Sequence, residues 1–147
     1  MMENAGALSS SRPTPWHLWV VGILALLWNA SGAYTIMMAQ AGRLPNLSAD
    51  EAAYYAAQPL WFMVVTDIAL IAAIAGAVAI LLKRRIAVWL FGVSLAAIVI
   101  SNVYDLATGM SRAVTSTGAL VVTAIIFVLA VLELVYVLVM RKRAVLV

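Results

Sequence analysis

Four polar or ionisable side chains interrupt long apolar stretches of this 147-residue sequence, and their types could support chemistry: Asn29, Asp67, Asp105 and Glu133. A charged side chain at the centre of a membrane helix costs about 2.5–3.5 kcal/mol on insertion scales, so such residues indicate function. No Lys or Arg lies within the apolar stretches, so neither Asp67 nor Glu133 has a cation at its own depth. Each acid must therefore be protonated, hydrated in a cavity, or reached by a basic residue from a helix end.

Depth along the helices groups some of these residues. At a rise of 1.5 Å per residue, Asn29 lies roughly 20 Å from the inner membrane boundary and Asp67 roughly 10 Å from the outer one. In a hydrocarbon core about 30 Å thick, both lie at nearly the same level. Asn102 lies nearer the outer surface. We predict a substrate-binding pocket open to the outer side, lined by Asn29, Asp67, Asn102, Tyr34 and Tyr104.

The two deep acids are predicted to differ in role. Asp67 is the favoured functional acid, taking or releasing a proton. It lies about 100° around its helix from Thr66, which belongs to the face of small residues. The alternative is a protonated Asp67 hydrogen-bonded to a neighbouring helix. Glu133 is expected at another level, roughly 12 Å from the inner boundary, with a structural interhelical role. Asp105 is interpreted as a solvated helix-end residue.

The composition excludes most catalytic chemistry. The chain has no cysteine, so disulfides, thiolate metal ligands and thiol nucleophiles are excluded. Its single histidine, His17, cannot build a multi-histidine metal or haem site and is expected to be an interfacial anchor. We therefore predict no catalytic residue, no metal and no cofactor. The net charge of +3 comes from basic clusters beside apolar runs, which is typical of membrane topology rather than of nucleic-acid binding.

The segments that position these residues are long and apolar. The chain is 66% hydrophobic and 10% charged, against about 25% charged residues in a soluble domain, so lipid must be its main solvent. Helices are the expected form, because unpaired backbone groups are not tolerated in lipid. The predicted fold is all-α, an antiparallel bundle of four transmembrane helices over 16–140, with a flexible cytoplasmic tail over 1–15 and a basic cytoplasmic tail over 141–147. The predicted spans cover about 16–38, 60–82, 86–104 and 118–140.

The distribution of basic residues predicts the orientation. Seven of the nine Lys and Arg residues fall on one side of the membrane when the N-terminus is placed inside. The positive-inside rule then puts both termini in the cytoplasm. Ala39-Gln40-Ala41 resembles a signal-peptide cleavage site. The apolar stretch before it is longer than usual for a signal peptide, so we expect the first helix to be retained.

The connections between spans carry two further signals. Ser48 followed by Glu51 is a capping-box pattern, which predicts a short helix from about Ala49 to Ala57, ended before Pro59. This helix is expected to be an outer interfacial spacer, the alternative being a substrate lid. The short Lys83-Arg84-Arg85 turn makes the second and third spans neighbours.

Three motifs occur in order along the first three spans. They are Leu26-Leu27-Trp28-Asn29-Ala30-Ser31-Gly32-Ala33-Tyr34, then Gln58-Pro59-Leu60-Trp61, then Leu81-Leu82-Lys83-Arg84-Arg85-Ile86-Ala87 with Phe91 and Ser94-Leu95. In these motifs the chain resembles a largely uncharacterised family of small four-helix bacterial inner-membrane proteins, some of them labelled sugar transporters. The likeness does not extend to the fourth span. It implies an inner-membrane location and carries over no catalytic residue.

Two functions fit these observations. The first is a small-molecule, sugar-like transporter or permease component, in which Asp67 handles a proton while Asn29 and Asn102 contact the substrate. Four helices make a thin bundle, so a transport path is expected to need a homo-oligomer. The second is a non-enzymatic accessory or structural subunit of a larger membrane complex. The lipid bilayer is the predicted environment of both.

Overall fold

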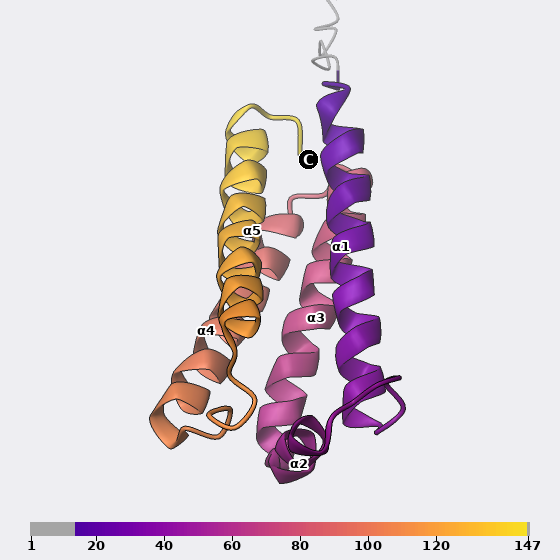
Figure 1. Ribbon diagram of the computed structural model, residues 1–147. Coiled ribbons are helices and arrows are strands. Elements are labelled where there is room, and N and C mark those ends of the chain that lie inside the picture. Colours follow the sequence, from indigo (N-terminus) through magenta and orange to yellow (C-terminus); the bar gives the residue numbers. More distant parts are fainter. Residues whose placement is uncertain (1–13, 147) are drawn as a thin grey trace, which may run out of the picture.

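Five α-helices make up residues 14–146, the part of the chain that the computed structural model describes, and no strand occurs in that range (Figure 1). In chain order they are α1 (His17–Gln40), α2 (Ala49–Ala57), α3 (Leu60–Leu81), α4 (Ala87–Thr108) and α5 (Thr117–Lys142). All except α2 are long and apolar enough to cross a membrane, which confirms the prediction of four apolar spans in an all-α chain. The length and composition of these helices describe a multi-pass membrane protein.

The third span extends further than predicted. We expected it to end near Tyr104, whereas α4 continues to Thr108 and stops at Gly109, whose φ is +65°. The Gly109 N–H donates to the Asp105 carbonyl at 2.8 Å. A glycine adopts this left-handed conformation without steric cost, so it ends the helix there. Asp105 therefore lies inside the last turns of α4.

Residues 1–13 of the predicted tail, which include Arg12, lie outside the described residues, and the described chain begins at the same end of the molecule as its C-terminus (Figure 1). The segment after α5 folds back on the bundle. Leu146 is fully buried, and its carbonyl accepts a hydrogen bond from Arg85 Nε at 3.1 Å. We call this end of the molecule the terminal end, and the opposite one the α2 end.

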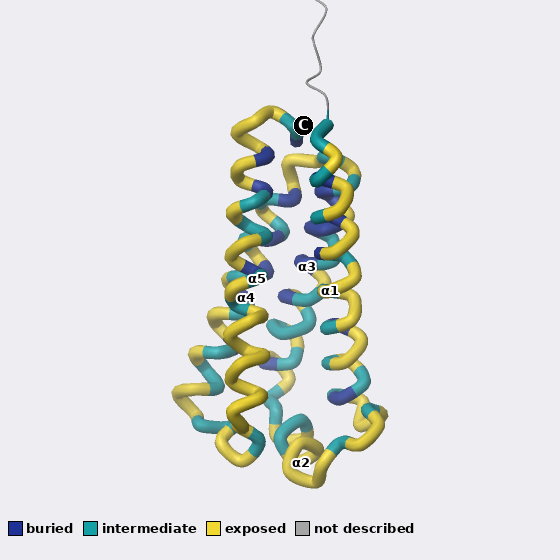
Figure 2. The backbone as a smooth tube through the Cα atoms, turned by 45° about the horizontal axis from the view of Figure 1, so that its top comes forward, coloured by how far each residue is buried: buried dark blue, intermediate teal, exposed yellow. Residues whose placement is uncertain are grey.

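The core lies towards the terminal end. Its largest buried side chains come from all four long helices and the C-terminal segment: Leu18, Ile80, Phe91, Val137 and Leu146. In Figure 2 the buried residues accordingly gather in the half that holds the C-terminus. α3 packs most extensively on α4, as the short turn between them predicts, and next on α1. Gly76 on α3 allows a close approach to Phe91 on α4. A Cβ at this position would lie 2.9 Å from the Phe91 ring.

The fourth long helix is the least buried. α5 packs mainly on α4, and its half towards the α2 end, from Thr117 to Ile126, is exposed throughout (Figure 2). Burial along α5 is confined to positions such as Ala130, Val137 and Met140, which belong to its other half. The bundle is thus closed at the terminal end and open beside α5 at the α2 end.

The short helix α2 has the predicted capping box. Ser48 Oγ accepts a hydrogen bond from the Glu51 N–H at 3.2 Å, and the Ser48 N–H donates to Glu51 Oε2 at 2.9 Å. These two bonds satisfy backbone donors that the first turn of a helix leaves free. At the other end, Gln58 is extended and precedes Pro59, so the helix ends where predicted.

Candidate functional site

A hydrogen bond joins the two polar residues that we expected at different depths. Asn29 Nδ2 on α1 donates to Glu133 Oε1 on α5 at 2.9 Å, and also to the Ala25 carbonyl at 2.9 Å. The expectation that Glu133 lies at another level from Asn29 is therefore wrong. The Cα–Cβ bonds of a helix tilt towards its N-terminus. Because α1 and α5 begin at opposite ends of the molecule (Figure 1), the two side chains lean towards each other and close the gap.

A second polar contact lies on the same face of α5. His17 Nδ1 and Tyr136 Oη are 2.8 Å apart, within hydrogen-bond distance, and their rings meet edge to face. Glu133 and Tyr136 are three residues apart, so both side chains project from one side of the helix. His17 and Asn29 thus tie α1 to the half of α5 that lies nearer the terminal end.

The predicted pocket is not assembled. Asn29 is bonded to Glu133, Tyr34 is 62% exposed, and Tyr104 packs edge to face on Trp61 at a centroid distance of 4.5 Å. Asp67 is half-buried. Its Oδ1 is enclosed and has no hydrogen-bond partner within residues 14–146. The five residues proposed as substrate contacts therefore do not line one cavity.

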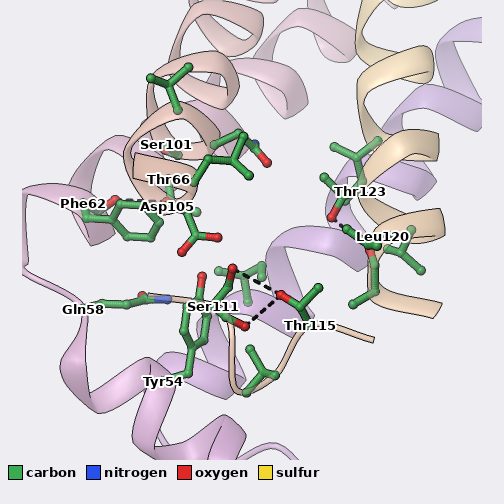
Figure 3. Close-up of a pocket in the computed structure, with 18 of the residues that line it drawn as sticks. Tyr54, Gln58, Phe62, Thr66, Ser101, Asp105, Ser111, Thr115, Leu120 and Thr123 are labelled. Atoms are coloured by element: carbon green, nitrogen blue, oxygen red, sulfur yellow. Dashed lines mark hydrogen bonds between the residues drawn. The ribbon is translucent and has the colours of Figure 1, made fainter. Parts of the chain in front are cut away.

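A different cavity lies at the α2 end, beside the exposed half of α5. This cleft has a volume of about 1190 Å³ and is lined by α2, α3, α4, α5, the end of α1 and the α4–α5 loop (Figure 3). Asn102 is the one predicted contact that lines it, and its Nδ2 donates to the Ile98 carbonyl at 2.9 Å. Thr66 lines the cleft as well, while its neighbour Asp67 does not.

Several residues that line this cleft carry an enclosed polar atom without a partner. Within the described chain, five buried side-chain polar atoms have no hydrogen-bond partner, and four of them belong to residues that line the cleft: Gln40 Nε2, Gln58 Oε1, Ser101 Oγ and Asp105 Oδ1. Buried polar groups in proteins are nearly always hydrogen-bonded. These four atoms have almost no accessible surface, so a ligand in the cleft reaches them only if the side chains turn.

The wall formed by α2 faces α4 across the cleft. The Tyr54 hydroxyl points towards the Asp105 carboxylate, with Gln58 beside them (Figure 3). Burial raises the pKa of Tyr54 to about 12, and the charge of Asp105 contributes to the increase. Tyr54 thus remains a neutral hydroxyl at every physiological pH. On the opposite wall, the Thr115 hydroxyl donates to the Ser111 carbonyl at 2.8 Å.

Four residues of the cleft were not predicted from the sequence to belong to a site: Gln40, Tyr54, Gln58 and Asp105. Asp105 was interpreted as a solvated helix-end residue, and Gln40 and Gln58 stood out only as parts of local motifs. Their shared signal was position, since each polar side chain stands at or near a helix end on the α2 side. No three His, Cys, Asp or Glu side chains gather to hold a metal ion anywhere between residues 14 and 146. The chemistry available in the cleft is that of amides, hydroxyls, the Asp105 carboxylate and the Arg112 guanidinium.

The helices and the cleft together define a multi-pass membrane protein with a lateral cavity at one end of its bundle. No family model, curated protein or solved structure matches the chain.

Proposed function

We propose that this protein is a small-molecule transporter or permease component of the bacterial inner membrane. Its four long helices form an antiparallel bundle, with both termini in the cytoplasm and α2 on the outer interface. Six basic residues support this orientation, because they cluster in segments at the terminal end: Lys83, Arg84, Arg85, Arg141, Lys142 and Arg143. The α2 end then faces outwards, and the cleft opens to the side from which a nutrient or toxin arrives.

One observation carries this proposal, namely a cleft of about 1190 Å³ whose wall combines apolar side chains of α5 with polar side chains of α2, α4 and the α4–α5 loop. A mainly apolar cavity with a few polar groups is the usual lining of a small-molecule site. Asp67 keeps its proposed role as the proton-linked acid. It is the neighbour of Thr66, which lines the cleft, and its side chain points about 100° away around the helix.

The cleft and the orientation are tested together by cysteine accessibility, since the chain has no cysteine of its own. Asn102→Cys places a thiol on the cleft, and Ser94→Cys places one on the same helix at a site that is only 3% exposed. A charged, membrane-impermeant thiosulfonate added to intact cells should label Asn102→Cys and leave Ser94→Cys unlabelled. Equal labelling of the two variants, or labelling of neither, contradicts an outward-facing cleft.

Transport itself is tested in proteoliposomes that contain the full chain. Radiolabelled glucose and a radiolabelled organic amine serve as probes under an imposed pH gradient. Uptake of one probe should follow the gradient and disappear in Asp67→Asn, while the exposed α2 variant Asp50→Asn retains it. Unchanged uptake in Asp67→Asn removes that residue from the mechanism, and gradient-independent behaviour of both probes contradicts a proton-linked transporter.

A second candidate function is that of an accessory subunit in a larger membrane complex or homo-oligomer. The observation that favours it is the exposed half of α5, where apolar side chains such as Leu120, Val121 and Val122 contact little of the bundle. Single cysteines at these positions should cross-link to a partner at a fixed stoichiometry in native membranes. If these cysteines react only with lipid-soluble reagents and form no cross-link to a protein, the transporter is the better explanation.

A further inference from the structure

The Asp105 carboxylate is the one anionic group among the side chains that line the cleft. Arg112 is the one cationic group there, and the remaining polar side chains are neutral amides and hydroxyls. A ligand that bonds the carboxylate must bring an N–H or O–H donor.

The charges on the cleft favour a cationic donor. Asp105 and Arg112 are the two charged residues that line it, and no ion pair joins them in the described part of the chain. The Arg112 side chain instead lies against Gly109 at the end of α4, close enough that a Cβ on this glycine would meet Nε. That position places the guanidinium beside the partial negative charge of a helix C-terminus. The Asp105 carboxylate is thus left without a cation of the protein.

The remaining surface of the cleft suits an apolar body. Two aromatic rings, Tyr54 and Phe62, stand beside Asp105 (Figure 3), and the opposite wall includes Leu120, Ile126 and Phe127 from α5. Aromatic faces attract organic cations, and aliphatic side chains accommodate a hydrocarbon tail. A sugar would leave most of this apolar wall in contact with hydroxyl groups.

We propose that the cleft binds an amphipathic organic amine, whose ammonium group lies beside Asp105 and whose apolar body packs against α5. This inference rests on the proposed function and specifies its substrate class. The ammonium donates to the Asp105 carboxylate and lies near the rings of Tyr54 and Phe62. Charge-assisted bonds of this kind are about twice as strong as neutral ones, so the amine is preferred over an uncharged analogue.

The test compares two ligands of nearly identical shape, 4-phenylbutylamine and 4-phenylbutanol. Binding of each to the full chain is measured by calorimetry in phosphatidylcholine nanodiscs, with empty nanodiscs as the reference. The amine should bind at least about tenfold more tightly than the alcohol, the factor expected for one charge-assisted hydrogen bond. Asp105→Asn should abolish this difference, and Asp50→Asn should preserve it. Equal affinities in the unaltered protein overturn the proposal.

A second variant guards against misfolding of Asp105→Asn. Phe62→Leu keeps the carboxylate and should weaken amine binding by about twofold to fivefold, as for one lost cation–π contact. Full amine affinity in Phe62→Leu contradicts the assigned position of the ammonium. Competition by phosphatidylethanolamine added to the nanodiscs would support the ammonium class and assign it to a lipid headgroup.

Glucose separates failure of this inference from failure of the proposed function. If glucose binds and the amine does not, the ligand class is wrong while the cleft stands as a substrate site. If neither ligand binds and the thiol of Asn102→Cys is also unreactive, then both this inference and the proposed function fail.

Discussion

Removing the Asn29 amide strands the Glu133 carboxyl, because that amide is the hydrogen-bond partner that the bundle provides for it. The bond is 2.9 Å long and joins α1 to α5, two helices that make few other contacts with each other. Asn29→Ala should therefore loosen α5 specifically. The loss has two components, the bond itself and the cost of leaving Glu133 unpaired.

The structure sets the size of each component. Interhelical hydrogen bonds in membranes average about 0.6 kcal/mol and reach about 1.7 kcal/mol in double-mutant cycles. A stranded buried acceptor adds about 1–3 kcal/mol. Since Glu133 is only half-buried, we place the second component near its lower limit. Asn29→Ala should thus cost about 1–3 kcal/mol, and a cycle with Glu133→Ala should give a coupling energy of about 0.6–1.7 kcal/mol.

Reversible unfolding in mixed micelles of dodecyl sulfate and dodecyl maltoside, followed by tryptophan fluorescence, provides the free energies. Glu133→Gln retains an acceptor oxygen and should keep most of the coupling to Asn29. Asn102→Ala is a matched control, because its amide donates only within its own helix, to Ile98. A coupling energy below about 0.3 kcal/mol, within the usual error of additivity, would refute the bond between Asn29 and Glu133.

Three further predictions concern packing and the α2 helix. Gly76→Ala should destabilise the bundle by about 1–3 kcal/mol in the same assay, because its Cβ would lie 2.9 Å from the Phe91 ring. Gly32→Ala, with nothing within 4 Å, should be neutral or up to about 1 kcal/mol stabilising, and the opposite order would show that α3 and α4 are not in close contact. Ser48→Ala should speed amide exchange in α2, as expected for a lost cap worth about 1 kcal/mol, without changing exchange in α3. The hydrogen bonds from Ser48 lower the pKa of Glu51 below its ordinary value of 4.5. Exchange protection of α2 should therefore be full above that pH and decline as the pH falls through the lowered pKa. Protection that does not change between about pH 3 and 6, roughly the window in which a carboxylate titrates, would contradict the capping box.

Features with local causes could be predicted from the sequence. Four apolar segments of sufficient length identify the long helices, and Ser48 with Glu51 marks the start of α2, because both signals depend on neighbouring residues alone. The end of α4 was missed by four residues, since Asp105 looked like an exposed helix end while the stop signal is Gly109.

The site depended on tertiary geometry that spacing along the chain does not contain. The depth calculated from helical rise gives the position of the backbone and ignores the length and tilt of the side chain. It therefore placed Asn29 and Glu133 at different levels, although their side chains are hydrogen-bonded. The cleft exists because α5 stands away from the bundle at the α2 end, and no pattern within α5 predicts this. Its polar residues come from all six segments that line it, from Gln40 at the end of α1 to Thr123 on α5.

Both polar contacts between α1 and α5 involve the half of α5 that lies nearer the terminal end, and the fully buried Leu146 anchors the segment that follows that half. The other half bears the cleft wall and has no comparable contact with α1 or α3. The cleft is therefore walled on one side by a stretch of α5 that packs mainly on α4. Neither Asn29 nor Glu133 lines the cleft. Asn29→Ala thus tests the stability of the anchored half of α5 without changing a residue of the cleft wall.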